Sequence, residues 1–160
     1  MDTDELAEEL GQPGAQQLLD RTAAHLAYSG PDGFPRVIPV GFLWTGDRVI
    51  VCTATTSPKV AALSTRPNVA LAIDSGDSPD GAKSLLVRGI ASLDTVDGVA
   101  DEYIAMSTKS MDAAQRAEFQ REVRKVYKQM VRISIEPQWA RFFDYGAGRL
   151  PAFLDKLVND

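Results

Sequence analysis

The chain has 160 residues, 44% of them hydrophobic and 24% charged, and a formal net charge of −5. These values are typical of one soluble globular domain, and the scattered Lys and Arg residues, not interleaved with aromatic ones, argue against a nucleic-acid-binding surface. No apolar run is long enough to span a membrane, and the acidic first ten residues lack the apolar segment of a signal peptide, so a cytoplasmic protein is expected.

Residues 1–21 are predicted to form an N-terminal extension with a short helix, and residues 22–160 a single domain. Strands are predicted where runs rich in Val, Ile and aromatic residues lie between Gly, Pro and Asp clusters. In chain order they span residues 23–28, 35–44, 48–53, 68–74, 84–93, 131–136 and 138–144. Helices are predicted over residues 58–66, 97–106, 112–130 and 150–158, and a polar loop over residues 75–82.

Local patterns add detail to these elements. The tight connection at residues 45–47 predicts a hairpin that pairs residues 35–44 with residues 48–53. Gly89, at the centre of a predicted strand, indicates a bulge or a close approach of two backbones. Six or seven antiparallel strands with a few flanking helices favour a mainly β barrel, because closure removes exposed sheet edges. The predicted helix over residues 112–130 has one apolar face, formed by Phe119, Val123, Val126, Tyr127 and Met130.

A candidate anion site lies where the second strand of this hairpin leads into a helix. Hydroxyl side chains from Thr53 to Ser57 precede Lys59 at the helix N-terminus, and the predicted hairpin brings Arg36 close to Thr53. Free backbone N–H groups, hydroxyl donors and two cations together favour phosphate. The alternative is an ordinary capped turn in which Lys59 is a solvated surface residue.

The same segment resembles a known family. Thr53-x-x-x-Ser57-x-Lys59, followed by Pro67-Asn68-Val69, is similar to the pyridoxamine 5′-phosphate oxidase-like split barrels, which bind a flavin. The resemblance implies that Thr53, Ser57 and Lys59 hold the cofactor phosphate. It also implies that the strand Arg36-Val37-Ile38-Pro39-Val40 runs along the flavin ring. The cofactor implied is FMN or the deazaflavin coenzyme F-420, and the activity is that of an oxidoreductase acting by hydride transfer on a small organic substrate.

The C-terminal region also matches this family. Pro137-x-Trp139-Ala140-Arg141-Phe142-Phe143, followed by Arg149-Leu150, keeps the spacing of the oxidase's Pro…Phe-Trp…Arg-Leu motif. On this match Phe143 packs near the flavin and Arg149 reaches the substrate. Ser84 stands where the family often has a Gln that is contributed across the dimer. The resemblance therefore implies a homodimer with the cofactor between its protomers.

The chain departs from the oxidase at two places. Pro58 replaces an Arg before the phosphate-binding Lys, and Val40 and Gly41 stand where the oxidase has a Lys that serves its substrate phosphate. A substrate other than pyridoxamine phosphate is therefore expected. Two further functions stay open: a non-catalytic flavin- or deazaflavin-binding protein, and a haem-binding split barrel with His25 as the imidazole ligand.

The two remaining chemically distinctive side chains are interpreted as structural. His25 stands mid-strand among small apolar residues, which favours a hydrogen-bonded structural histidine over a general base. Cys52, the single cysteine, is interpreted as a small buried apolar residue. A single cysteine excludes an intramolecular disulfide and a cysteine-based metal centre. We therefore expect no bound metal.

Overall fold

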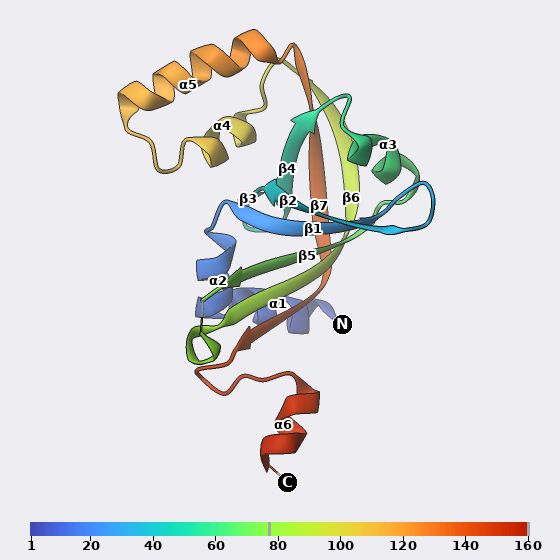
Figure 1. The fold of residues 1–160 in the computed structure, drawn as a ribbon, viewed down its shortest axis with the longest axis vertical. Helices are drawn as coiled ribbons and strands as arrows, with labels where there is room; N and C mark the ends of the chain where they lie inside the picture. The colour runs from blue at the N-terminus through green and yellow to red at the C-terminus, as the bar shows by residue number, and fades with distance from the viewer. Residues whose placement is uncertain (77, 160) are drawn as a thin grey trace.

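A seven-stranded antiparallel sheet forms the centre of the molecule (Figure 1). The computed structural model describes residues 1–76 and 78–159; positions 77 and 160, in the predicted loop and at the end of the predicted domain, lie outside the described residues. The strands are β1 Ala23–Ser29, β2 Pro35–Gly41, β3 Leu43–Trp44, β4 Val49–Ala54, β5 Asn68–Ser75, β6 Lys83–Asp97 and β7 Gln129–Asp144. Their order in the sheet is β2-β1-β5-β6-β7-β4-β3, and the predicted split β-barrel is confirmed.

Helices surround this sheet. They are α1 Thr3–Gly11, α2 Pro13–Leu19, α3 Pro58–Thr65, α4 Asp101–Ser107, α5 Ala113–Val126 and α6 Ala152–Asn159, with a 3-10 turn at Pro79–Gly81. Leu18 and Leu19 of α2 belong to the same buried cluster as Leu26 of β1, Leu71 of β5 and Ile133 of β7. The N-terminal segment therefore completes the core of the sheet. None of the described helices is both long and apolar enough to cross a membrane.

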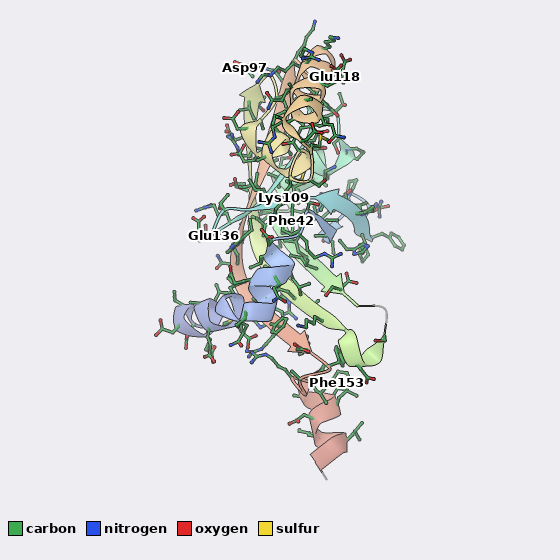
Figure 2. The ribbon with its side chains drawn as sticks, turned by 90° about the vertical axis from the view of Figure 1, so that its left-hand side faces the viewer. Phe42, Asp97, Lys109, Glu118, Glu136 and Phe153 are labelled. Carbon is green, nitrogen blue, oxygen red and sulfur yellow. The ribbon has the colours of Figure 1, made fainter. Side chains whose placement is uncertain are left out.

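The longest elements, β6 and β7, pair along their whole length and set the long dimension of the molecule. In Figure 2, Asp97 at the end of β6 lies at the end of the molecule opposite Phe153 of α6. The ladder has a single register shift, at Arg88 and Gly89, where Gly89 faces Pro137. A Cβ on Gly89 would lie 2.5 Å from the Glu136 carbonyl oxygen. The predicted bulge or close approach at Gly89 is thus confirmed.

The prediction of two strands separated at Pro137 is wrong, because this proline lies at the bulge. A residue that lacks an N–H is tolerated there, since the ladder is already interrupted. One continuous strand of 16 residues, β7, therefore replaces the two predicted strands.

The predicted hairpin of residues 35–44 with residues 48–53 is mostly wrong. Only Leu43 and Trp44 pair with β4, whereas β2 pairs with β1 along its full length. The chain leaves β2 at Phe42, whose side chain is fully buried and whose N–H bonds to the Thr22 carbonyl. This buried aromatic residue separates β2 from β3, so that the two strands lie at opposite ends of the sheet order.

The helix predicted over residues 112–130 begins as expected and ends early. Asp112 caps α5 through a reciprocal pair of bonds with Gln115. The helix stops at Val126, which is 71% exposed, and Met130 is buried as part of β7. The predicted apolar face is therefore wrong in its last part. Residues from Gln129 onwards pair with β6 instead, and this ladder overrides the helical pattern.

Candidate functional site

Hydrogen bonds at the two ends of the β1–β2 ladder fix which backbone groups of β2 are free. The Phe42 N–H bonds to the Thr22 carbonyl, and the Gly30 N–H bonds to the Phe34 carbonyl. The register between these ends is unbroken. Because hydrogen-bonded and non-hydrogen-bonded pairs alternate in an antiparallel ladder, even-numbered residues of β2 bond to β1. Odd-numbered residues direct their N–H and C=O groups to the free edge.

This free edge carries few donors. Two of its four odd-numbered residues, Pro35 and Pro39, have no N–H, so the donors left on the edge are those of Val37 and Gly41. Prolines occur in strands at positions where no ladder bond is needed, which is the case here. The predicted ring-contacting segment is therefore an edge strand with an isolated N–H donor between two prolines.

The side chains of β2 alternate between the two faces of the sheet. Arg36, Ile38 and Val40 lie opposite core-facing residues of β1, and Ile38 and Val40 pack against the buried cluster. Val37 points outward and is 66% exposed. Arg36 pairs with Asp32 at 2.7 Å and donates to the Phe34 carbonyl. Its guanidinium thus already has partners within the hairpin turn.

The predicted phosphate loop leads from β4 into α3. Thr53 is half-buried near the end of β4, and Ser57 occupies the cap position of α3 in an extended conformation. The Ser57 hydroxyl makes no capping bond to the helix backbone and instead accepts a hydrogen bond of 2.9 Å from the Lys59 ammonium. The first N–H groups of α3 consequently have no side-chain cap, and they carry the positive end of the helix dipole.

Lys59 is half-buried at this point, and burial lowers the pKa of its ammonium. Within the described residues, no carboxylate forms an ion pair with it. A desolvated cation without a counter-ion beside an uncapped helix start is a place where an anion is favoured. The alternative reading of Lys59 as a solvated surface residue does not fit its burial.

Arg36 and Lys59 come from two elements, β2 and α3, that each adjoin β1. Helix α3 packs against β1, and the β1–β2 hairpin turn lies on the same side of the molecule as α3 (Figure 1). Arg36 pairs across the hairpin with Tyr28 of β1. The β2–β4 pairing by which the sequence predicted the approach of Arg36 to Thr53 is not formed in the described residues, and none of their hydrogen bonds or ion pairs joins Arg36 to Lys59.

The other predicted site residues form a second group. Ser84 of β6 lies directly opposite Phe143 of β7. Thr53 pairs with Val131, and Phe143 lies twelve residues further along the same strand, a distance of roughly 40 Å at the rise of an extended chain. Within a single chain, Ser84 and Phe143 are therefore far from the predicted phosphate loop.

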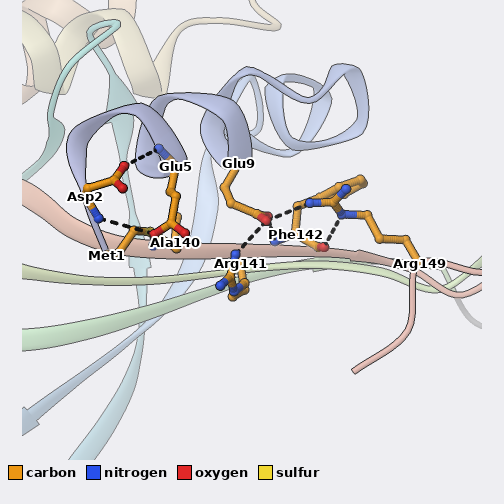
Figure 3. Close-up of polar contacts among 8 residues, drawn as sticks. All are labelled: Met1, Asp2, Glu5, Glu9, Ala140, Arg141, Phe142 and Arg149. Carbon is orange, nitrogen blue, oxygen red and sulfur yellow. Dashed lines mark hydrogen bonds and ion pairs between the residues drawn. The ribbon is translucent and has the colours of Figure 1, made fainter. Parts of the chain in front are cut away.

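Arg149, predicted to reach a substrate, belongs to this second group (Figure 3). Its Nη2 lies 2.7 Å from Glu9 Oε1, and its Nε donates to the Phe142 carbonyl. Glu9, from α1, also accepts hydrogen bonds from the Arg141 side chain and the Phe142 N–H, both at 2.9 Å. Sequence reasoning missed Glu9, because nothing in the acidic run of α1 distinguishes it from its exposed neighbour Glu8.

The interpretation of His25 as a hydrogen-bonded structural residue is wrong, and that of Cys52 fits. His25 points out of the sheet with 56% of its side chain exposed, and its Nδ1 lies 3.8 Å from Asp74. Cys52 is half-buried, and burial raises its thiol pKa to about 11, which disfavours the reactive thiolate. In the described part of the chain, no three acidic, His or Cys side chains gather as a metal site.

The sequence profile of the pyridoxamine 5′-phosphate oxidase family matches residues 13–142. The chain belongs to this family. Solved structures with the family's fold include an F-420 reductase, which is 26% identical, with a TM-score of 0.58, over 78% of this chain and 94% of its own. No curated protein matches the chain.

Two other solved structures show the fold alone. A conserved hypothetical protein from Mycobacterium tuberculosis has a TM-score of 0.66 at 19% identity, covering 94% of this chain and 89% of its own. A haem storage protein from Vibrio cholerae has a TM-score of 0.59 at 17% identity, covering 81% and 92%. Proteins with this fold are thus described as a reductase in one case and as a haem storage protein in another. The fold therefore does not by itself determine the cofactor.

The contacts of Glu9 predict a pH-dependent contribution to stability. Burial raises the pKa of this carboxyl, but hydrogen bonds from Phe142, Arg149 and Arg141 outweigh burial and lower it below its ordinary value of 4.5. A lowered pKa stabilises the fold above pH 4.5, and this contribution is lost as the pH falls through the folded-state value. Glu9→Gln removes the charge that attracts both arginines and is expected to lower the free energy of unfolding at pH 7. The loss is limited to about 1–2 kcal/mol because both arginines are partly exposed to solvent.

Urea unfolding of both proteins at pH 7 and below pH 4 checks this expectation. The difference between wild type and Glu9→Gln shrinks as the pH falls below 4.5, because the unfolded state then binds a proton at Glu9 more readily than the folded state does. A difference that is the same at both pH values would show that the Glu9 charge is not responsible.

Proposed function

We propose that this chain binds a flavin-type cofactor, FMN or coenzyme F-420, by its phosphate and acts as an oxidoreductase on a small organic substrate. The half-buried ammonium of Lys59, which has no carboxylate partner in the described residues, is the observation that carries the proposal. An anionic phosphate group satisfies this charge, the Ser57 hydroxyl and the uncapped N–H groups of α3 together. Membership of the family supports the same cofactor class.

The residues of β2 fit a flat heterocycle beside this phosphate group. The free edge of β2 offers the Val37 N–H and the carbonyl oxygens of odd-numbered residues, while Pro35 and Pro39 remove competing donors. Ile38 and Val40 anchor the strand in the core, so that this edge is rigid. When bound, a reduced flavin or deazaflavin supplies the hydride, and the protein supplies binding, orientation and shielding from water.

A homodimer completes this proposal. The outer face of the sheet is apolar around Val37, Leu86 and Ile90, which are 66%, 37% and 47% exposed. Two adjoining hollows of about 550 and 270 Å³ share Ala27, Ala70 and Arg88 on this face. Large exposed apolar patches favour association. We propose that a second copy covers this face.

The same association would join the two groups of predicted site residues. In the proposed dimer, Ser84, Phe143 and Arg149 of the second copy reach the Lys59 region of the first, where they cannot arrive within one chain. The proposed cofactor site would then lie between protomers. A substrate site that includes Arg149 requires the same arrangement.

Replacing Lys59 tests the phosphate contact. Lys59→Met keeps the aliphatic chain and removes the charge, so the dissociation constant of FMN or coenzyme F-420 is expected to rise roughly 10- to 100-fold, as for a lost charged hydrogen bond. Fluorescence titration of each cofactor with purified protein measures this change and shows which cofactor is preferred. Lys125→Met, on the exposed face of α5, is the control.

An unchanged dissociation constant in Lys59→Met would remove the phosphate contact from the proposal. Turnover of the reduced, bound cofactor with added electron acceptors separates an oxidoreductase from a protein that binds the cofactor without turnover.

Placing a charge on the outer face of the sheet tests the dimer. Leu86→Arg is expected to convert the dimer to a monomer, because it adds a cation beside Arg88 and opposite Arg141, and burying an unpaired charge costs several kcal/mol. Light scattering after size-exclusion chromatography measures the mass, and the same samples are titrated with cofactor. Val126→Arg, at an exposed position on α5, is the matched control. A monomeric wild-type protein, or a Leu86→Arg dimer, would contradict the proposed interface.

Haem binding is a second candidate, because His25 lines an apolar hollow on the outer face. The hollow is about 270 Å³, and Val37, Leu86 and Trp139 line it beside His25. An imidazole in apolar surroundings is a common haem ligand. If haem binds here, reconstituted protein has a Soret band that is lost in His25→Ala. A spectrum that is unchanged by this substitution would exclude His25 as the ligand.

A further inference from the structure

Glu9 lies outside the part of the chain that matches the family, yet it contacts the region predicted to complete the site. The family match begins at residue 13, and α1 precedes it. Glu9 is 7% exposed and is the only buried charged side chain among the described residues. A buried carboxylate is retained in a fold only when hydrogen bonds and opposite charges compensate for its desolvation.

The compensation comes from one edge of β7. Strand β4 pairs with β7 only as far as Val49 and Ile135, so the rest of this edge has no neighbouring strand among the described residues. The N-terminal segment covers it: the Ala140 N–H bonds to the sulfur of Met1, which precedes α1, and the Phe142 N–H bonds to Glu9 Oε2 in α1. Glu9 thus takes the place of a missing strand at Phe142, which is itself buried.

The same carboxylate also holds two guanidinium groups. Arg141 Nη1 and Arg149 Nη2 both bond to Glu9 Oε1, at 2.9 and 2.7 Å (Figure 3). The Arg149 guanidinium is fixed further by the Phe142 carbonyl, 2.8 Å from its Nε, and lies 5.9 Å from the centre of the Phe142 ring. Arg149 therefore has a defined orientation in the protomer. Within the described residues its Nη1 has no partner and can bind a ligand.

Contacts on both sides of Phe143 define its position as well. Glu9 bonds to Arg141 and Phe142 before it, and to Arg149 after it. Asp144 and Arg149 form a backbone bridge that closes the intervening turn. The carboxylate of Glu9 thus ties down the segment that carries both the aromatic side chain and the arginine assigned to the site.

We propose that Glu9 is a positioning residue for the cofactor site, and that Arg149, which the family resemblance places at the substrate, contacts the bound cofactor as well. Glu9 holds Arg149 and the backbone beside Phe143 in the geometry with which this end of β7 reaches the cofactor bound by the partner protomer. This inference rests on the proposed function. A flexible arginine must lose rotamer freedom on binding, whereas one already held by a carboxylate loses less, so the held geometry increases affinity.

A double-mutant cycle between Glu9 and Arg149 tests this role. FMN and coenzyme F-420 are titrated against wild type, Glu9→Gln, Arg149→Ala and the double variant, each confirmed folded and dimeric. Glu9→Gln keeps the size and one acceptor oxygen, and its dissociation constant is expected to rise about tenfold. In the Arg149→Ala background the same change is expected to have less than a threefold effect, because Glu9 acts through Arg149.

The matched controls separate positioning from stability. Glu8→Gln, on the exposed side of α1, is expected to leave the dissociation constant unchanged. Glu9→Asp keeps the charge and shortens its reach, so it tests the geometry if Glu9→Gln does not fold; an increase of threefold or more in the dissociation constant is expected. Folded Glu9 variants with the wild-type constant, or effects that multiply in the double variant, would overturn the proposal. Wild-type protein that binds neither cofactor would instead contradict the proposed function.

Discussion

The long β6–β7 ladder is the constraint on which the other parts of the molecule depend. Its two strands extend well beyond their neighbours, so other elements must cover the strand edges at each end of the ladder. At one end β4 pairs with β7 and leads into α3, which carries Lys59. At the other end β4 is absent, and α1 covers the exposed edge with Glu9. The predicted phosphate loop and the ion pair of Arg149 with Glu9 are therefore at opposite ends of one element, and the distance between them follows from strand length.

Much of the fold could be predicted because its signals are local. Ser57-Pro58 marks the start of α3 and Asp112 that of α5, since capping chemistry depends on neighbouring residues. The close approach at Gly89 could be predicted from one residue, since a side chain there would collide with the backbone of β7. The strand boundaries are correct within a few residues where the apolar alternation is strong, as in β1 and β5.

The parts that sequence reasoning missed depend on partners distant in the chain. The short connection in sequence predicts that residues 35–44 pair with β4, but a full-length pairing of β2 with β1 and the burial of Phe42 decide the arrangement. The apolar pattern predicts a longer α5 because it continues through Val126, and only the pairing of Gln129 with Asp97 interrupts it. Glu9 accepts hydrogen bonds from residues more than 130 positions away in the chain, and no local sequence pattern indicates such a contact. The split of the predicted site into two groups likewise becomes visible only once strand register is known.

The two prolines of β2 have an effect beyond the site. An uncovered strand edge is normally a template on which other molecules add strands, leading to intermolecular sheets and fibrils. Pro35 and Pro39 interrupt the row of donors that such growth needs, so the edge resists templated polymerisation while its carbonyl oxygens stay accessible. Because of these two prolines, β2 needs no covering helix to keep its edge from pairing with another strand.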